Sequence, residues 1–190
     1  MKKITNFLFE IATLRRMVRS HHQMIKEADD NISDHIFRVA VIGNILAKLE
    51  NCDDAKVIKM CLFHDILETR TGDANFINRQ YTEQKEEEAR KDQLEGLPIA
   101  EEVLELLEEY EKRESKESIV AKDADNLDQM LLQQEFLLRD DENRKVWQDF
   151  TEKKLKTESA KKIAKEIRKT NPFEWLYSLA EKKTGYKIDN

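Results

Sequence analysis

The chain has 190 residues, of which 39% are hydrophobic and 38% are charged, and it contains only four glycines and two prolines. This composition is typical of a compact all-α protein with short connections, and the length fits one domain with a substantial core. The net charge of -6 excludes a nucleic-acid polymer as the main partner, because such binding requires a basic face. A small phosphate ligand remains compatible with this charge.

The sequence predicts no membrane segment. The apolar stretch at the N-terminus is interrupted by polar residues and is followed by two arginines, so we expect an amphipathic helix there. The longest other apolar stretch, residues 39–49, is far shorter than the roughly 20 residues that span a bilayer. Cys52 and Cys61 lack metal-finger spacing and are expected to be reduced thiols, which favours a cytoplasmic location.

Residues 4–18 are predicted to form the first helix, because apolar side chains recur at intervals of three and four. Residues 19–31 lose that period and collect turn formers, so they are expected to form a loop of the kind that often lines sites. Ser33 is expected to cap a second helix that runs to about Leu49, with His35 near its start. The stripe of the first helix consists of Ile4, Phe7, Leu8, Ile11, Leu14 and Val18.

The third predicted helix, from Ala55 to about Thr69, is the most informative part of the chain. It is mostly apolar, yet it contains the adjacent pair His64-Asp65. An imidazole and a carboxylate that face a protein interior cost free energy unless they are paired, hydrogen-bonded or bound to a metal. The alternative interpretation is a core histidine that is hydrogen-bonded to its neighbourhood. The helix is expected to end near Gly72, which favours a left-handed cap.

Residues 81–95 are strongly charged and predict a solvated helix or flap without chemistry. Pro98 is expected to open an amphipathic helix that extends to about Tyr110. Residues 118–139 predict one long helix, and Asp123 and Asp125 lie on opposite sides of its apolar stripe. That stripe consists of Val120, Ala124, Leu127, Leu131 and Leu138.

The C-terminal part predicts helices that pack on the rest of the protein. Its apolar residues are Val146, Trp147, Phe150, Leu155, Ile163, Ile167, Phe173, Trp175, Leu176 and Leu179, with Pro172 opening the last helix. No repeat and no sharp shift of composition demands a second domain. We therefore expect a single domain over residues 1–190, with a core at about 4–140 and a helical extension at about 141–190.

His35, the His64-Asp65 pair and Asp125 lie on three separate predicted helices, in the order His, His-Asp, Asp. With their flanks, this order resembles the HD-domain phosphohydrolases, an all-helical superfamily. The resemblance implies that His35, His64, Asp65 and Asp125 hold one divalent metal ion. Periodicity alone leaves Asp123 open as the fourth ligand, and the family pattern selects Asp125. The flanks are Ser33-Asp-His-Ile-Phe-Arg-Val-Ala, Phe63-His-Asp-Ile-Leu-Glu-Thr-Arg-Thr-Gly-Asp73 and Lys122-Asp-Ala-Asp-Asn-Leu127.

Two imidazoles and two carboxylates neutralise a divalent cation and leave coordination positions for water and substrate. This donor set suits Mn²⁺, Co²⁺, Ni²⁺, Fe²⁺ or Mg²⁺ rather than a structural zinc ion. All four histidines precede Ile66, so none is available downstream for a second metal. We therefore expect one ion per chain, and this weighs against a binuclear cyclic-nucleotide phosphodiesterase.

Within the superfamily the chain is most similar, over about residues 4–140, to the 5'-deoxyribonucleotidase branch, whose members remove phosphate from deoxyribonucleoside monophosphates. This likeness depends mainly on Glu68 and on Thr71-Gly72-Asp73. It implies that Glu68 acts on the attacking water and that Asp73 contacts a sugar hydroxyl or transfers a proton. The alternatives are a Glu68 at the surface paired with Arg70, and an Asp73 that only forms a turn.

A phosphate dianion beside carboxylates needs a cation, and the planar fork of an arginine is suited to hold it. The branch places an arginine followed by an aromatic residue ahead of the first histidine motif, and the best candidate here is Arg19. Where the family has a tryptophan, this chain has His21-His22. Either His22 stacks on the nucleoside or both histidines are ordinary loop residues.

These expectations define a cytoplasmic, metal-dependent phosphomonoesterase that acts on deoxyribonucleoside monophosphates. The resemblance also implies a homodimer, with the aromatic helices around Trp147 and Trp175 as the contact. Two alternatives stay open: an HD hydrolase that acts on other nucleotides or phosphomonoesters, and a non-catalytic HD module that binds nucleotide or a partner.

Overall fold

The computed structural model describes residues 1–24, 30–136 and 141–185, without the side chains of His22 and Asp141. Within these ranges the chain is helical, and the one β-type contact is an isolated antiparallel bridge between Val18 and Asn31. The predicted all-α fold is confirmed. No helix in the described ranges is both long enough and apolar enough to cross a membrane.

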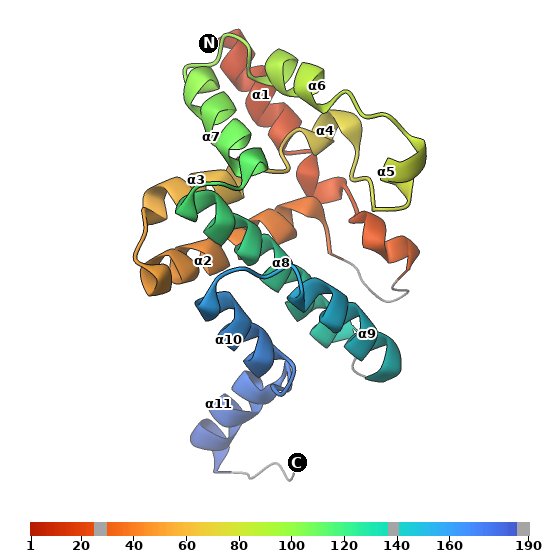
Figure 1. The fold of residues 1–190 in the computed structure, drawn as a ribbon, viewed down its shortest axis with the longest axis vertical. Coiled ribbons are helices and arrows are strands. Elements are labelled where there is room, and N and C mark those ends of the chain that lie inside the picture. Colours follow the sequence, from red (N-terminus) through yellow and green to blue (C-terminus); the bar gives the residue numbers. More distant parts are fainter. Residues whose placement is uncertain (25–29, 137–140, 186–190) are drawn as a thin grey trace.

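Three helices, α2, α3 and α8, pack against one another at the centre of the molecule (Figure 1). Helix α7 packs on α3 and α8, while α9 and α10 pack on α8; α1 lies at the opposite end of the molecule from α11. The elements are α1 (Lys2–Ile11), η1 (Leu14–Arg16), η2 (Ser20–Gln23), α2 (Ile32–Glu50), α3 (Asp54–Phe63), α4 (Glu68–Thr71), α5 (Asn78–Tyr81), α6 (Glu86–Leu94), α7 (Ala100–Lys112), α8 (Lys116–Phe136), α9 (Asp141–Glu152), α10 (Glu158–Ile167) and α11 (Glu174–Thr184).

The central core lies between α2, α3 and α8. A close approach of α2 and α3 depends on Gly43, because a Cβ atom there would lie 2.6 Å from the Cys61 sulfur and 3.1 Å from a Val57 methyl. Such contacts are far below van der Waals distance, so a larger residue would push the two helices apart. The fully buried side chains of this core include Val39, Leu46, Val57, Met60, Cys61, Val120, Ala124, Leu127 and Met130.

The N-terminal helix is shorter than predicted, because α1 ends at Ile11 and the chain continues as a short 3-10 helix. The Thr13 hydroxyl donates to the Glu10 carbonyl at 2.7 Å, so a side-chain hydrogen bond satisfies a backbone carbonyl at the end of the helix. Of the predicted stripe, Leu14 is buried, whereas Leu8 and Val18 are exposed.

Helix α2 is capped by Asn31 and not by Ser33. The Asn31 side chain accepts the Asp34 backbone N–H at 3.1 Å and donates to the Asp34 carboxylate at 2.8 Å. This reciprocal pair satisfies an amide at the helix start. It places His35 in the first turn of α2, where the side chain is 2% exposed.

The predicted helix from Ala55 to Thr69 breaks in two. Helix α3 ends at Phe63, and His64-Asp65 begins a tight turn that leads into α4. The His64 ring donates through Nδ1 to the Cys61 carbonyl at 2.8 Å, and the following amides bond three residues back instead of four. This local competition for carbonyls explains the break.

The C-terminal helices pack less than predicted. Ile167 and Leu155 are buried, but Val146 and Phe150 on α9 are exposed, and α11 contains no buried residue. The reason is visible in Figure 1, where α11 extends away from the central helices. The predicted helical positions Leu138 and Arg139 lie outside the described residues; α8 is described to Phe136.

Candidate active site

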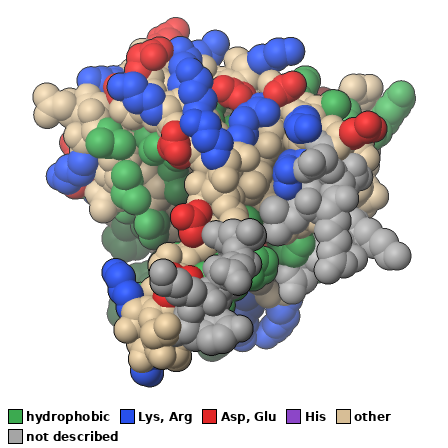
Figure 2. Space-filling model, turned by 90° about the horizontal axis from the view of Figure 1, so that it is seen from below, with side chains coloured by type: hydrophobic (Ala, Val, Ile, Leu, Met, Phe, Trp, Pro, Cys, Tyr) green, Lys and Arg blue, Asp and Glu red, His purple; other side chains and the backbone are tan. Residues whose placement is uncertain are grey.

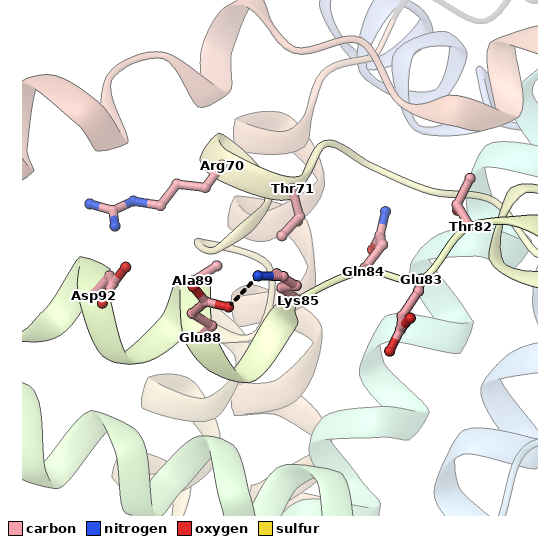
Figure 3. Close-up of a pocket in the computed structure, with 9 residues that line it drawn as sticks. All are labelled: Arg70, Thr71, Thr82, Glu83, Gln84, Lys85, Glu88, Ala89 and Asp92. Carbon is pink, nitrogen blue, oxygen red and sulfur yellow. Dashed lines mark ion pairs between the residues drawn. The ribbon is translucent and has the colours of Figure 1, made fainter.

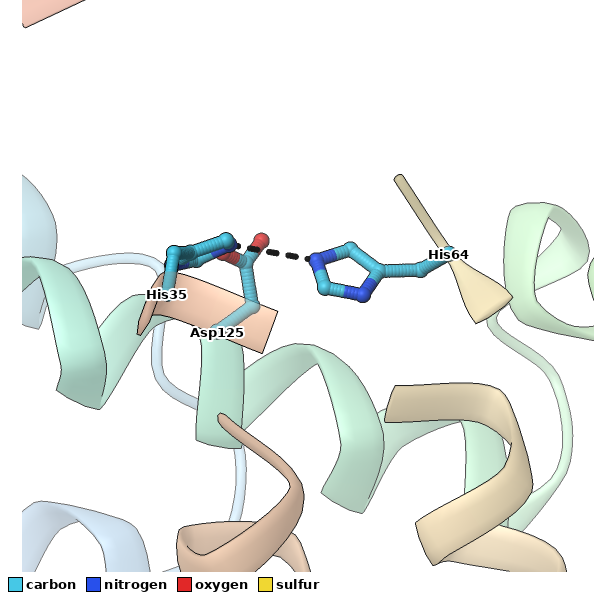
Figure 4. Close-up of side chains that lie close together, drawn as sticks. All are labelled: His35, His64 and Asp125. Carbon is cyan, nitrogen blue, oxygen red and sulfur yellow. Dashed lines mark hydrogen bonds and ion pairs between the residues drawn. The ribbon is translucent and has the colours of Figure 1, made fainter. Parts of the chain in front are cut away.

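Three side chains from distant parts of the chain converge in the centre of the fold. His35 comes from the start of α2, His64 from the end of α3 and Asp125 from α8 (Figure 4). One ligand atom of each lies within 4.8 Å of the others. The two ring nitrogens Nε2 are 3.3 Å apart, and an Asp125 oxygen lies 3.5 Å from His35 Nε2.

Asp65 completes this cluster. Its Oδ2 atom lies 3.2 Å from His64 Nε2 and 3.4 Å from His35 Nε2. Two atoms that each coordinate one ion at about 2.1 Å are separated by about 3.0–3.4 Å at octahedral or tetrahedral angles. The observed separations therefore match neighbouring ligands of a single ion.

The hydrogen bonds of the two imidazoles fix which nitrogen faces the cluster. His64 Nδ1 donates to a carbonyl, which can only accept, and His35 Nδ1 lies 2.7 Å from an Asp128 carboxylate oxygen. When both rings are neutral, each Nε2 atom therefore presents a lone pair to the other. Two lone pairs at this distance repel unless a proton or a metal ion lies between them.

The electrostatics of the cluster also favour a cation. Burial and Arg19 lower the pKa of His35, but its contacts with the Asp128 and Asp65 carboxylates outweigh them and raise it to about 9. Burial alone would raise the pKa of Asp65, and the neighbouring His64 and His35 hold it well below its usual range. Burial opposes the ionisation of Asp125 too, but Lys122 and His35 lower its pKa. A metal ion competes with the proton for the same negative surroundings.

Glu68 stands beside the cluster, at the start of α4. It is 5% exposed, and its Oε2 atom has no hydrogen-bond partner. Burial, together with the Asp65 and Asp73 carboxylates, raises its pKa to about 9. Burying a carboxyl oxygen without a hydrogen-bond partner costs free energy. Such a group, with a shifted pKa and facing a cavity, is a candidate for a catalytic role. The alternative pairing with Arg70 is not made, because Arg70 binds Glu10.

Arg19 bridges two of the predicted site carboxylates. Its NH1 atom donates to Asp65 at 3.3 Å, and its Nε atom lies 3.8 Å from Asp73. Asp73 in turn accepts the backbone N–H of Ser20 at 2.7 Å, so it ties the turn after α4 to the Arg19 segment. Arg19, the only predicted phosphate ligand, is thereby held at the edge of the cluster.

The two loop histidines differ in what the structure describes. His21 is buried, and its Nε2 atom lies 2.7 Å from an Asp30 carboxylate oxygen. The side chain of His22, a predicted substrate contact, lies outside the described part of the structure. Of the His21-His22 pair, the structure therefore describes the side-chain contacts of His21.

Asp123 and Asp125 have different roles on the same helix. Asp123 accepts the backbone N–H groups of Lys156 and Thr157 and the Thr157 hydroxyl, all at 2.7–3.1 Å. It therefore holds the N-terminus of α10 and does not belong to the cluster. The structure agrees with Asp125 as the candidate ligand.

The sequence analysis missed two residues behind His35. Asp128 accepts from His35 Nδ1, and Arg38 donates to the other Asp128 oxygen at 2.5 Å. Arg38 lies three residues after His35 on α2, and Asp128 lies three residues after Asp125 on α8. Each therefore shares a helix face with a candidate ligand. That spacing was the available signal.

The cluster opens into a cavity of about 690 Å³. Arg19, Glu68 and Asp73 line it near the cluster, and α9 forms another wall. This volume lies within the usual range of small-molecule sites. The residues of α8, α9 and the turn after α9 in its lining are Lys122, Asp125, Asn126, Gln129, Gln133, Val146, Trp147, Phe150, Thr151 and Lys154.

A second cavity of about 560 Å³ lies between the end of α4, residues 82–85 and α6 (Figure 3). Its charged groups already pair in part, as in the contact between Lys85 and Glu88 at 2.9 Å. None of the candidate ligands lines it, so we assign it no chemistry. The lining consists of Arg70, Thr71, Thr82, Glu83, Gln84, Lys85, Glu88, Ala89 and Asp92.

Comparisons with known proteins agree with this geometry. A sequence profile of the HD domain matches residues 11–171. The 5'-deoxynucleotidase HDDC2 of Bos taurus is 29% identical over 142 residues, which cover 71% of this chain and 68% of that protein. The protein of the same name from Mus musculus is 30% identical over 139 residues, covering 70% and 69%.

Solved structures show the same fold. A conserved hypothetical protein from Pyrococcus furiosus superposes with a TM-score of 0.72 at 26% identity, over 87% of this chain and 99% of that one. A predicted metal-dependent phosphohydrolase from Magnetospirillum magnetotacticum gives a TM-score of 0.68 at 23% identity, over 88% and 90%.

The chain therefore belongs to the HD-domain family. Within that family it is a hydrolase similar to the 5'-deoxynucleotidases, as the motif resemblance predicted.

Proposed function

We propose that this hydrolase removes the 5'-phosphate from deoxyribonucleoside monophosphates and that it uses one divalent ion per chain. The observation that carries this proposal is the pair of histidine Nε2 atoms 3.3 Å apart, flanked by Asp65 and Asp125, at the end of a cavity that also contains Arg19. The names of the relatives support the substrate class.

The donor set fits the expected metal. His35, His64, Asp65 and Asp125 would hold the ion, and the mixture of imidazole nitrogen and carboxylate oxygen suits Mn²⁺, Co²⁺, Ni²⁺, Fe²⁺ or Mg²⁺. A bound ion supplies Lewis acidity toward a phosphoryl oxygen and lowers the pKa of a coordinated water.

Arg19, Glu68 and Asp73 bind the substrate and move protons. Arg19 holds the phosphate dianion through its planar guanidinium, which its contacts with Asp65 and Asp73 already orient. Glu68 aligns the attacking water and accepts its proton. Its raised pKa suits this role only when positive charge balances Asp65 and Asp73, which ties base strength to an occupied site. Asp73 contacts the sugar hydroxyl or carries a proton toward the leaving oxygen.

The reaction balances with water as the only co-reactant. The water oxygen forms a bond to phosphorus, and the bond from phosphorus to the 5'-oxygen breaks. One proton of the water passes to Glu68, and one proton is returned from Glu68, through Asp73 or solvent, to the leaving 5'-oxygen, which becomes the nucleoside hydroxyl. The products are a deoxyribonucleoside and inorganic phosphate.

The test is phosphate release from deoxy- and ribonucleoside monophosphates and from nucleoside triphosphates, each with Mn²⁺, Co²⁺, Mg²⁺ or chelator. We expect release from the deoxynucleotides with metal and none with chelator. Glu68→Gln is expected to lower turnover about 100-fold or more while metal stays bound, because proton transfer contributes about 10²–10⁴. Release that is equal in Glu68→Gln, or seen only with nucleoside triphosphates, would contradict the proposal.

We also propose that the protein is a cytoplasmic homodimer. Both cysteines are free, which suits a reducing compartment. Trp147 is partly buried and packs on Leu132, so of the two predicted contact residues Trp175 is the more exposed, at 65%. Apolar side chains also reach the surface between charged ones when the molecule is viewed from the α11 end (Figure 2). The exposed apolar residues of α11 and the preceding residue are Phe173, Trp175, Leu176 and Leu179.

Sedimentation equilibrium tests the dimer. We expect the unchanged chain to sediment as a dimer and the double variant Trp175→Ser, Leu179→Ser to sediment as a monomer. The control is Phe9→Ser, which removes an equally exposed apolar side chain at the other end of the molecule. A dimer that survives the double change would exclude α11 as the contact.

A further inference from the structure

The two candidate histidine ligands are held from behind by different kinds of partner. His64 Nδ1 donates to the Cys61 backbone carbonyl at 2.8 Å, whereas His35 Nδ1 pairs with the Asp128 carboxylate at 2.7 Å. A carbonyl carries only a partial charge, while a carboxylate carries a full one. The two imidazoles therefore differ in basicity as well as in position.

Asp128 is the inner end of a line of alternating charges between α2 and α8. Arg38 Nε donates to Asp128 Oδ1 at 2.5 Å, and Arg38 NH1 donates to both oxygens of Glu135 at 2.8 and 3.0 Å. The Asp128 side chain is 3% exposed and the Glu135 side chain 38%. The line thus runs from solvent at Glu135 to the buried ring of His35.

We propose that Asp128 is a positioning residue for the metal site, and that Arg38 and Glu135 hold it in place. Its carboxylate keeps the proton of His35 on Nδ1, fixes the plane of the ring and makes Nε2 a stronger donor toward the ion. Metal affinity is therefore expected to depend on a residue that does not touch the metal. This inference depends on the proposed metal site but not on the identity of the substrate.

Helix α8 contains an internal comparison for this role. Asp123 is buried to the same degree as Asp128, at 1% against 2% exposure, and it also accepts several hydrogen bonds. Its partners are the backbone of Lys156 and Thr157, which belong to the start of α10. The two carboxylates should therefore cost similar stability when they are neutralised, and only Asp128 should change metal binding.

The experiment compares Asp128→Asn with Asp123→Asn in the full chain. Each protein is titrated with Co²⁺ after chelation, and both the d–d absorption bands and the heat of binding are recorded. Loss of a ligand's outer partner typically lowers metal affinity about 10- to 100-fold, and we expect that loss in Asp128→Asn with altered bands. Asp123→Asn is expected to bind Co²⁺ like the unchanged protein. Glu135→Gln, at the exposed end of the line, is expected to give a smaller loss, and it tests the inference without disturbing a buried site.

The inference is overturned if Asp128→Asn binds Co²⁺ as tightly as the unchanged chain, or if Asp123→Asn loses as much affinity as Asp128→Asn. If Asp128→Asn does not fold, an unchanged affinity in Glu135→Gln overturns it. These readouts need no turnover, so they are separate from the nucleotidase proposal. Failure of the unchanged chain to bind Co²⁺ would instead refute the metal site itself. Binding of Co²⁺ without release of phosphate from any nucleotide would refute the proposed function and leave this inference standing.

Discussion

At the scale of single residues, the site concentrates groups that are expensive to bury. Glu68 is the clearest case, since it is enclosed, one of its oxygens has no partner and its pKa is raised to about 9. Buried carboxylates of this kind lower the stability of a fold unless a ligand compensates for them. The site should therefore leave a signature in the stability of the metal-free protein.

We predict that, in chelator, the free energy of unfolding falls as pH rises from about 4.5 toward 9. Glu68 has a folded pKa near 9 against an ordinary value of 4.5, so the folded chain retains a proton that the unfolded chain has already released. Its contribution is complete below pH 4.5 and is lost as pH rises through the folded pKa. Urea unfolding at pH 5–9 measures this slope.

Glu68→Gln is the control for that experiment. Glutamine keeps the shape but cannot ionise, so the decline with pH should be shallower in this variant. His35, whose pKa is also raised, contributes a decline of the same sign in both proteins, so a decline remains in Glu68→Gln and only the difference between the two curves reports on Glu68. Parallel curves for the two proteins would show that Glu68 is not the titrating group.

The sequence predicted the residues that meet at the site better than the residues that support them. The HD motif order drew attention to His35, His64, Asp65 and Asp125, and the structure brings all four together. Asp128 was missed because its role depends on a contact between α2 and α8; its spacing from Asp125 places it on the ligand's helix face but does not show that contact. The geometry of a ligand's second nitrogen is a tertiary property.

At the scale of elements, the sequence predicted helix positions well and helix ends poorly. The long apolar run around Met60 looked continuous, yet the His64 ring takes the Cys61 carbonyl and the helix ends at Phe63. Side chains that compete for backbone groups act over single residues, so periodicity averages over them. The turn that results directs the His64-Asp65 pair into the cavity.

The packing of α2 on α3 gives a prediction at this scale. In Gly43→Ala, overpacking should lower the free energy of unfolding by about 1–3 kcal/mol, while the better helix propensity of alanine should raise it by roughly 1 kcal/mol. We expect the overpacking to dominate. The obstacle is the Cys61 sulfur, 2.6 Å from the added methyl group, so Cys61→Ala should reduce the cost of Gly43→Ala. Urea unfolding of the four proteins of this double-mutant cycle measures the coupling. Additive effects would show that the sulfur is not the obstacle.

At the scale of the whole molecule, the helical class followed from composition and period, and the bundle followed from the resemblance to HD-domain proteins. The C-terminal end did not, because an amphipathic pattern predicts a helix but does not say whether its partner lies within the same chain. Helix α11 has the pattern and buries no residue. Residues 11–171, which match the HD domain, end before α11 begins at Glu174, so α11, like most of α1, lies outside the matched range.

The stability of the whole fold should depend on metal binding at the carboxylate cluster. An ion that binds only the folded state stabilises it by about 2.7 kcal/mol at 100 times its dissociation constant. For a chain of this length we expect Mn²⁺ to raise the melting temperature by about 5–10 °C relative to chelator. Asp125→Ala should abolish the shift and also melt lower than the unchanged protein in chelator, because it removes the carboxylate that pairs with Lys122 and His35. Asp123→Ala should melt lower but keep the full shift, since its carboxylate stabilises the start of α10 and not the site. Scanning calorimetry of the three proteins with and without Mn²⁺ decides this, and a shift that persists in Asp125→Ala would place the ion elsewhere.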